Sequence, residues 1–322
     1  MHPVNHRFIE SNGIRMHLAE QGEGPLVILC HGWPELWYSW RYQMAALAAA
    51  GYRVVAPDLR GFGQTEAPQA IEAYQMLHVT ADIVGIVDAL DKEQVIIAGH
   101  DWGAAVAWNC ALFRPDIFRR LILLSVPYIQ RRWDSPRPTD VMRQLGDGGH
   151  EFYMIYFQEP GRAEAELEAD IRRSFIGIFT GYSTPQPSLP LVHKKDGLLR
   201  GVGKGDKRPD WLSEADLDVY VQEYRRSGFR GGLNYYRNLD RSAWEMNAAW
   251  TGARIYQPSL FISGEYDTVV RDMNPHDFQR LEETMPGLTQ KILLPKTGHW
   301  VQQQRPSEVN QLMLDFLQDT AP

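Results

Sequence analysis

Apolar and polar positions follow two different patterns along the chain. In the first 129 residues, short apolar runs such as 94–99 (QVIIAG) alternate with segments in which apolar residues recur every three to four positions. Compact runs are typical of buried strands, and the recurring positions predict helices, such as residues 80–91 with Thr80 as the expected N-cap. Strands that alternate with helices predict a parallel sheet with helices on both faces.

The second pattern occupies the middle of the chain, from about Ile129 to Ala248. This part has no buried-strand run, is helical and charged, and includes a long predicted loop at 183–210, where Pro, Gly and Lys are frequent. Strand character then returns. The predicted elements are two strands within 7–20 around a turn at Asn12-Gly13, strands at 25–30, 52–61, 94–99, 120–127, 259–264 and 291–298, and helices at 40–51, 80–91, 104–115, 162–175, 213–229 and 307–319.

Together the two patterns predict one doubly wound α/β domain that is interrupted by a helical insertion. We expect residues 1–129 and 249–322 to form the core, because strands alternate with helices in both parts. Residues 130–248 are expected to form a helical cap.

Composition narrows the partners and the compartment. Hydrophobic residues make up 44% of the 322 residues, and 33 basic against 40 acidic residues give a net charge of −7, which argues against nucleic acid as a partner. No apolar run approaches the roughly 18 residues of a membrane span, and the first residues (MHPVNHRFIESNG) lack the apolar core of a signal peptide. Cys30 and Cys110 lie in apolar surroundings, so two buried free thiols are expected. These features predict a cytoplasmic protein.

Residues 94–103 (QVIIAGHDWG) place Asp101 between two glycines where a predicted strand meets a predicted helix. Gly-x-nucleophile-x-Gly at such a junction is the nucleophile elbow, a tight turn that needs small flanking residues and lifts the central side chain above the sheet edge. A plain strand–helix turn, in which Asp101 only caps the helix, is an equally good interpretation of this segment alone.

Two further segments favour the catalytic interpretation. Asp267 (in GEYD) follows the predicted strand 259–264, and His299 (in KTGHW) follows the predicted strand 291–298. The order nucleophile, acid, histidine is that of the α/β-hydrolase triad. The predicted cap accounts for the long stretch of chain between Asp101 and Asp267. We therefore expect an α/β-hydrolase fold with Asp101 as nucleophile and with His299 as the base that Asp267 orients.

An aspartate where this fold usually has a serine changes the expected chemistry. A carboxyl group with an ordinary pKa near 4 is about 99.9% ionised at pH 7, so Asp101 can attack without a base. Its attack on an ester or amide would give a labile anhydride, whereas displacement at a saturated carbon gives a stable ester. The substrate is therefore expected to carry an electrophilic sp³ carbon, as an epoxide or a halide does. His299 is expected to activate the water that hydrolyses the ester.

The expected oxyanion hole consists of two backbone N–H groups. Residues 31–34 (HGWP) follow the predicted strand 25–30, where this fold places one donor, here Trp33. The residue after the nucleophile, Trp102, supplies the other. His31 is expected to be a structural hydrogen-bonding residue, and Pro34 to follow a cis peptide bond.

The motifs HGWP, GHDWG, GEYD and KTGHW, with YMIYFQEPG (153–161) and SGFRGGLNYYRN (227–238) in the predicted cap, resemble the soluble epoxide hydrolase family. The similarity runs from about residue 8 to residue 318, and the cap motifs are its specific part, because related dehalogenases share the other four. The resemblance implies that water is added to a small lipophilic epoxide to give a vicinal diol. It also implies two cap tyrosines that protonate the epoxide oxygen, which match Tyr153 and Tyr236.

Neighbouring tyrosines compete for these two assignments. Tyr156 lies on the same helical face as Tyr153 and is the alternative to it. Tyr235 is adjacent to Tyr236, and since neighbours on a helix diverge by about 100°, only one of the two can face a pocket. An aromatic residue on such a helix is more often part of the core than an acid.

No cofactor or metal is expected, because the sequence contains no HExxH, paired CxxC, GxGxxG or Walker motif.

Two other functions compete with epoxide hydrolysis. A haloalkane dehalogenase would use the same Asp101, Asp267 and His299, with Trp102 as one halide donor, but HGWP lacks the asparagine that often supplies the other. A catalytically silent ligand sensor with this fold is the second alternative, and the complete triad argues against it.

Overall fold

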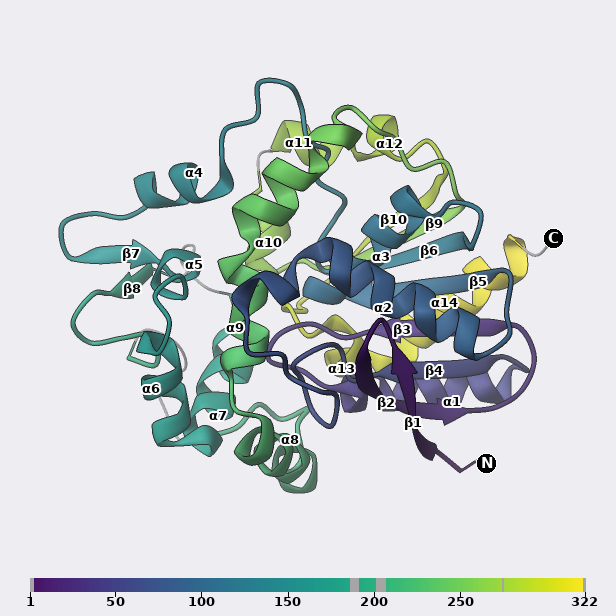
Figure 1. The fold of residues 1–322 in the computed structure, drawn as a ribbon, viewed down its shortest axis with the longest axis horizontal. Helices are drawn as coiled ribbons and strands as arrows, with labels where there is room; N and C mark the ends of the chain where they lie inside the picture. Colours follow the sequence, from purple (N-terminus) through teal and green to yellow (C-terminus); the bar gives the residue numbers. More distant parts are fainter. Residues whose placement is uncertain (1–2, 186–190, 201–206, 274, 321–322) are drawn as a thin grey trace.

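The computed structural model describes residues 3–185, 191–200, 207–273 and 275–320, and its centre is a mixed sheet (Figure 1). Eight strands pair in the order β1-β2-β4-β3-β5-β6-β9-β10. The pairs β1–β2 and β2–β4 are antiparallel, and the remaining pairs are parallel. The strands are β1 (Asn5–Ser11), β2 (Ile14–Gln21), β3 (Leu26–Cys30), β4 (Arg53–Pro57), β5 (Val95–His100), β6 (Phe118–Leu124), β9 (Ser259–Gly264) and β10 (Leu288–Leu294). The predicted doubly wound, mostly parallel sheet is confirmed.

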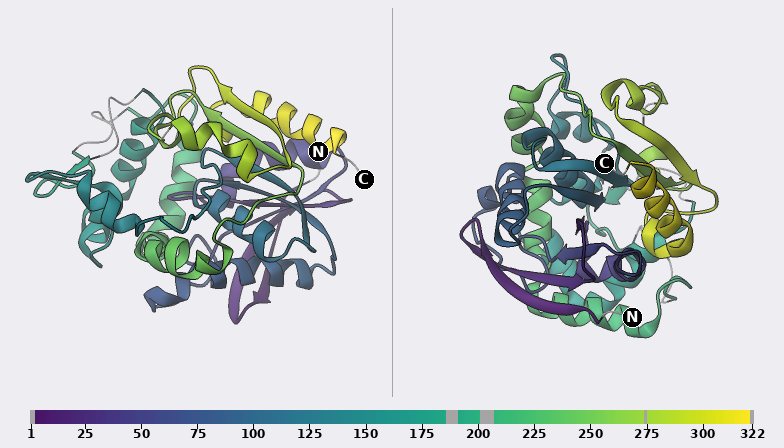
Figure 2. Two further views of the ribbon diagram at one scale, coloured as in Figure 1. Left: turned by 90° about the horizontal axis from the view of Figure 1, so that it is seen from above. Right: turned by 90° about the vertical axis from the view of Figure 1, so that its right-hand side faces the viewer.

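Both faces of this sheet are buried. Successive side chains of a strand point to opposite sides of the sheet, and each side packs in an apolar cluster of its own. Leu26 and Ile28 of β3 belong to one apolar cluster, and Val27 and Leu29 belong to the other. Helices α2 (Met76–Ala89) and α3 (Trp102–Phe113) pack on the first face, whereas α1 (Arg41–Ala49) and α14 (Pro306–Asp319) pack on the second (Figure 2). This packing holds the carboxyl ends of β5, β9 and β10 in fixed positions.

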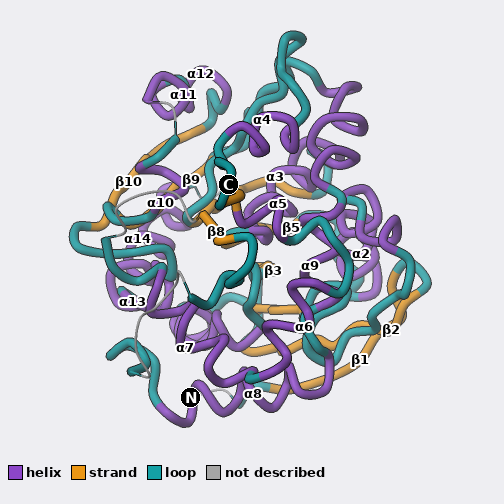
Figure 3. Tube along the Cα trace, turned by 90° about the vertical axis from the view of Figure 1, so that its left-hand side faces the viewer, coloured by secondary structure: helices purple, strands orange, loops and turns teal. Residues whose placement is uncertain are grey.

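The elements between β6 and β9 lie beside one end of the sheet (Figure 1), and Figure 3 views them from that side. They are α4 (Pro138–Gln144), β7 (His150–Phe152), α5 (Tyr153–Tyr156), α6 (Arg162–Ala169), α7 (Ile171–Gly181), β8 (Leu191–His193), α8 (Glu214–Ser227) and α9 (Arg230–Arg237). Short helices α10 (Thr268–Arg271), α11 (Pro275–Gln279), α12 (Leu281–Thr284) and α13 (Val301–Gln304) complete the chain, with 3₁₀ turns at Trp37–Trp40, Ile71–Tyr74 and Met246–Trp250 and a π-helical turn at Asp240–Glu245. The limits 1–129, 130–248 and 249–322 for core and cap stay predictions.

Two predicted helices begin or end elsewhere. Helix α2 starts at Met76 rather than Thr80, because Gln75 already has the extended backbone of an N-cap, so Thr80 lies inside the helix. The predicted helix 162–175 is two helices. Asp170 is extended, with φ −148° and ψ 90°, and its side chain accepts a bond from the Arg173 N–H, which ends α6 and caps α7.

The middle of the chain contains strands, which the sequence pattern did not predict. Strands β7 and β8 pair antiparallel, with Phe152 opposite Leu191. β8 falls within the predicted loop 183–210, of which residues 186–190 and 201–206 lie outside the described residues. Each of these strands spans only three residues, which is too short for a period-two pattern to stand out from the helical background. Ser213 and Asp216 form a capping box at the start of α8.

Candidate active site

Asp101 occupies a strained turn between β5 and α3. Its backbone has φ 51° and ψ −120°, a conformation that L-residues rarely adopt. A Cβ on Gly99 would lie 2.0 Å from the Gly103 carbonyl oxygen, and a Cβ on Gly103 would lie 2.0 Å from the Cys30 carbonyl oxygen. Both glycines are therefore required by close backbone packing, as the elbow interpretation expects.

The Asp101 side chain does not cap α3. It accepts no capping bond from the N–H groups of the second or third helical residue, which an N-cap side chain would do. Instead its Oδ1 accepts a bond of 2.8 Å from the Trp33 N–H, and the Trp102 N–H also bonds to the carboxyl group. Gly32 makes this approach possible, since a Cβ there would lie 2.4 Å from the Asp101 Cβ. The two expected oxyanion donors therefore both bond to the Asp101 carboxyl group, Trp33 through Oδ1, and the plain helix-cap interpretation is wrong.

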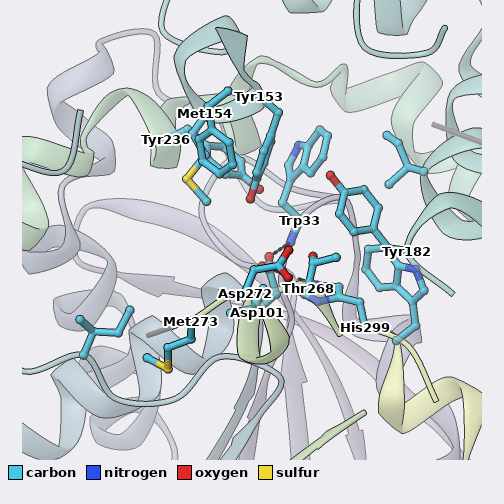
Figure 4. A pocket seen from close by; sticks show the side chains of 15 residues that line it. Trp33, Asp101, Tyr153, Met154, Tyr182, Tyr236, Thr268, Asp272, Met273 and His299 are labelled. Carbon is cyan, nitrogen blue, oxygen red and sulfur yellow. Dashed lines mark hydrogen bonds and ion pairs between the residues drawn. The ribbon is translucent and has the colours of Figure 1, made fainter. Parts of the chain in front are cut away.

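The other carboxyl oxygen of Asp101 faces the histidine. His299 Nε2 lies 3.7 Å from Asp101 Oδ2, and His299 Nδ1 lies 3.1 Å from Asp267 Oδ1. Asp267 follows β9, where its Oδ1 also accepts from the Val269 N–H at 3.0 Å. The three residues that the sequence placed at strand ends therefore converge, with the imidazole between two carboxyl groups. Figure 4 shows Asp101 and His299 where they line the cavity.

Ser125 is part of this group, and sequence reasoning assigned it no role. Its hydroxyl donates to Asp267 Oδ2 at 2.5 Å and lies 2.8 Å from His299 Nδ1. It follows β6, the strand between β5 and β9, and its backbone has φ 69°. A serine at the end of a predicted strand is too common a feature to have signalled this position.

The sequence-predicted cap tyrosines also reach this centre. Tyr153 and Tyr236 line a cavity of about 240 Å³ together with Asp101, His299 and Trp33. Their ring centroids are 6.0 Å apart, and Figure 4 shows both hydroxyl groups on the side of the cavity opposite His299. Most of the remaining lining is apolar and includes Ile129, Phe152, Met154, Ile178 and Met273. The cavity is at or below the lower end of the roughly 300–1,000 Å³ typical of ligand pockets.

The competing tyrosines point elsewhere. The Tyr156 hydroxyl donates to Glu166 Oε2 at 2.7 Å, and the Tyr235 hydroxyl donates to the Arg60 carbonyl oxygen at 3.1 Å. Neither residue lines the cavity. Their positions agree with the choice of Tyr153 and Tyr236.

Comparison with known proteins gives the same picture over nearly the whole chain. A family model described as the alpha/beta hydrolase fold matches residues 25–157. Epoxide hydrolase A of Mycobacterium tuberculosis is 42% identical over 317 residues, which cover 97% of this chain and 96% of that protein. The chain belongs to the epoxide hydrolase family.

Solved structures agree with this assignment. The epoxide hydrolase from an endophytic Streptomyces is 48% identical with a TM-score of 0.92, covering 98% of this chain and 95% of that one. Epoxide Hydrolase A from Mycobacterium thermoresistibile is 44% identical with a TM-score of 0.91, covering 98% of both chains. The resemblance to epoxide hydrolases and the α/β-hydrolase fold are thus confirmed.

The charges of this epoxide hydrolase centre depend on one another. Burial disfavours the imidazolium, but the charge and hydrogen bond of Asp267, and then the charge of Asp101, outweigh it and raise the pKa of His299 to about 9. Burial also opposes the Asp267 carboxylate, yet its pKa is lowered, chiefly by His299 and then by the Ser125 hydrogen bond. An imidazolium flanked by two carboxyl groups is the form that these shifts favour.

The expected ordinary pKa of Asp101 is wrong. Burial raises it, and the opposing effects of His299, His100 and the two tryptophan N–H groups reduce the rise without cancelling it. Only 16% of the Asp101 side chain is exposed. The positive charge of His299 therefore favours the ionised form of Asp101, an effect that sequence reasoning did not include.

A pH-dependent stability follows from the His299 shift. A group whose pKa is raised from 6.5 in the unfolded chain to about 9 stabilises the fold fully below pH 6.5, and this contribution is lost as the pH rises to 9. We expect the unfolding free energy to fall by up to about 3 kcal/mol over this window. Urea unfolding at several pH values measures it. In Asp267→Asn, which lacks the main cause of the shift, the decrease should be largely absent; an unchanged slope would contradict this origin.

A second buried carboxylate connects the loops of the site. Glu35 Oε2 accepts from the Gly32 N–H at 3.1 Å and lies 2.7 Å from His100 Nδ1, while His100 Nε2 lies 2.8 Å from the His299 carbonyl oxygen. Burial opposes its charge, but His100 and the Gly32 N–H outweigh burial and lower the pKa of Glu35 to about 2. Its Oε1 accepts from Gln302 and Gln303 at 3.0 Å each. Sequence reasoning missed Glu35, which directly follows HGWP, and His100, which lies inside GHDWG. Neither residue stands at a spacing that would indicate its role.

Other expectations concern residues around the centre. The His31 ring bonds to the Gly32 carbonyl at 2.8 Å and accepts from the Leu59 N–H at 3.0 Å, so its structural role is confirmed, and the Trp33-Pro34 bond is cis. Cys30 and Cys110 are both buried and free. Within the described ranges, no cluster of three His, Cys, Asp or Glu residues could hold a metal. No helix in that same part of the chain could cross a lipid bilayer.

Proposed function

We propose that this member of the epoxide hydrolase family converts a small lipophilic epoxide and water into a vicinal diol through an ester on Asp101. The observation that carries the proposal is the different environment of the two Asp101 oxygens. Trp33 donates to Oδ1 at 2.8 Å, whereas Oδ2 faces the cavity and His299 at 3.7 Å. One oxygen is therefore held in place and the other is available to attack a substrate.

In the first step, Asp101 Oδ2 bonds to one oxirane carbon, and the bond from that carbon to the ring oxygen breaks. The electron pair moves to the ring oxygen, which takes a proton from Tyr153 or Tyr236. Burial, and then the nearby charges of the site, raise the pKa of both phenols well above their usual value, so both are protonated at neutral pH. Two such donors suit an alkoxide that remains attached to the product.

In the second step, His299 removes a proton from water, and the hydroxide adds to the Asp101 carboxyl carbon. The negative charge develops on Oδ1, where the Trp33 and Trp102 N–H groups donate to it. Collapse breaks the bond from the carboxyl carbon to Oδ2, and the leaving oxygen takes the proton that His299 removed from water, so the diol carries Oδ2 away. The proton of the new Asp101 carboxyl group returns to the tyrosine that protonated the ring oxygen, which restores the starting state. Esterification removes the Asp101 charge that helps to raise the pKa of His299, which makes the neutral imidazole easier to reach.

The alternatives have less support. In the structure, the Trp102 side chain, which would hold a halide in a dehalogenase, hydrogen-bonds to Tyr236 instead. A silent ligand sensor does not require the three-residue convergence at Asp101. Two buried free cysteines support the cytoplasmic location that we propose.

Phenylalanine substitutions test the proton donors. Tyr153→Phe and Tyr236→Phe should each slow ring opening by roughly 10- to 100-fold, since each removes one hydrogen bond to a developing charge while the other phenol remains. The double variant should lose more. Stopped-flow tryptophan fluorescence, or quenched single turnovers, measures the alkylation rate.

Two neighbouring tyrosines serve as matched controls. Tyr156→Phe and Tyr235→Phe remove hydroxyl groups that bond to Glu166 and to the Arg60 carbonyl outside the cavity, so ring opening should stay close to that of the unchanged chain. If Tyr156→Phe slows alkylation as strongly as Tyr153→Phe does, the assignment of the first donor is wrong.

A further inference from the structure

Tyr182 is a third tyrosine of the cavity, and no step of the proposed reaction uses it. It follows α7 as the C-cap residue, where its N–H bonds to the Ile178 carbonyl at 3.2 Å. Its own carbonyl accepts from the His299 N–H at 2.8 Å, and a Cβ on Gly298 would lie 2.3 Å from that carbonyl oxygen. Tyr182 is therefore held against the loop that carries His299.

The Tyr182 ring forms a wall of the cavity that also contains Asp101, Tyr153 and Tyr236. Its centroid lies 6.0 Å from that of His299. Figure 4 shows its hydroxyl directed away from His299, into the cavity and toward the Trp33 ring. This places the hydroxyl beside the space that a substituent of the epoxide would occupy, rather than beside the water that His299 activates.

Buried phenols of α8 and α9 that lie outside the cavity donate hydrogen bonds to other residues. Tyr220 donates to Gln303 at 3.2 Å, Tyr224 to the Glu35 carbonyl at 3.3 Å and Tyr235 to the Arg60 carbonyl at 3.1 Å. Tyr182 is half-buried, and among the described residues no hydrogen bond reaches its hydroxyl. Burial, followed by the charges of Asp101 and Asp267, raises its pKa, so the group stays protonated and can donate.

We propose that the Tyr182 hydroxyl recognises an acceptor oxygen in the substituent of the epoxide, one carbon away from the ring, so that glycidyl ethers are favoured over their hydrocarbon counterparts. This inference rests on the proposed function. Tyr153 and Tyr236 are engaged by the ring oxygen, and the wall near Tyr182 also contains Ile178 and Trp300, so an ether oxygen there would otherwise lose its hydrogen bond to water.

A matched substrate pair isolates this contact. Phenyl glycidyl ether and phenethyloxirane differ only in that a methylene group replaces the ether oxygen. The quantity to measure is the ratio of their kcat/KM values, by diol formation. We expect Tyr182→Phe to lower the ratio of ether to hydrocarbon by roughly two- to tenfold, the effect of one neutral hydrogen bond.

Two further variants make the test specific. Thr268→Val removes the hydroxyl of another residue lining the cavity, and Tyr156→Phe removes a cap phenol outside it; both should leave the ratio unchanged. A general disturbance of the cap would slow both substrates equally and leave the ratio unchanged in Tyr182→Phe, which would overturn the inference. A shift of the ratio in Thr268→Val instead would overturn it as well. If the unchanged chain forms no diol from either epoxide, the proposed function itself fails.

Discussion

Replacing His299 by glutamine is expected to let the epoxide ring open but to stop the reaction at the Asp101 ester. The base for the second step is then missing, so diol formation should fall by roughly 10²- to 10⁴-fold. At pH 8, one equivalent of epoxide should be consumed in a burst, and mass spectrometry should find its mass added to the peptide that contains Asp101. The alkaline pH matters because loss of the imidazolium removes an effect that lowers the pKa of Asp101.

The double variant Asp101→Ala with His299→Gln is the control. No epoxide mass should be added to the peptide that contains residue 101. Sustained turnover by His299→Gln at a rate near that of the unchanged chain would show that water is activated elsewhere. An adduct on a residue other than Asp101 would show that the nucleophile is misassigned.

Replacing Asp101 by alanine should abolish diol formation, by roughly 10⁴-fold or more, because neither step has a substitute for its carboxyl group. In the unchanged chain, a single turnover in water enriched in ¹⁸O should place the label in Asp101 and leave the first diol unlabelled. Mass spectrometry of the peptide and of the diol measures both. A labelled diol in the first turnover would instead mean direct attack of water on the epoxide.

Asp91→Ala is a matched control for backbone strain. Asp91 is an exposed aspartate whose φ of 53° is also positive, so alanine meets an unfavourable φ at both positions. Asp91→Ala should keep full activity. Equal loss of activity in both variants would point to a folding defect rather than to a missing nucleophile.

The core of the fold could be predicted because its strands and turns are marked by apolar runs and glycines that are close together in the sequence. Strand β5 is a continuous apolar run, and the glycines at 99 and 103 mark the turn that follows it. The pair β7–β8 could not be predicted, since three-residue strands leave no period. The division of α6 from α7 at Asp170 depends on one extended residue inside an otherwise continuous helical pattern.

The convergence of Asp101, Asp267 and His299 follows from strand order, so the sequence alone places these residues together. The positions of Ser125, Glu35 and Tyr182 do not follow from it, because each acquires its contacts from segments far away in the chain. Glu35, for example, contacts His100 and Gln302, which lie 65 and 267 residues away along the chain. The pKa of Asp101 escapes prediction for a related reason: sequence shows the neighbours along the chain but not the burial that the fold imposes.

The groups proposed for the two half-reactions come from different stretches of the chain. Tyr153 and Tyr236 sit on α5 and α9, while Asp267, His299 and both oxyanion donors follow strands of the sheet or lie beside them. Drift or laboratory selection confined to α5 and α9 can therefore retune which oxiranes are accepted, and how fast they are captured, while leaving the release of glycol intact. The range of epoxides that react and the rate at which the ester is hydrolysed can therefore change independently in this fold.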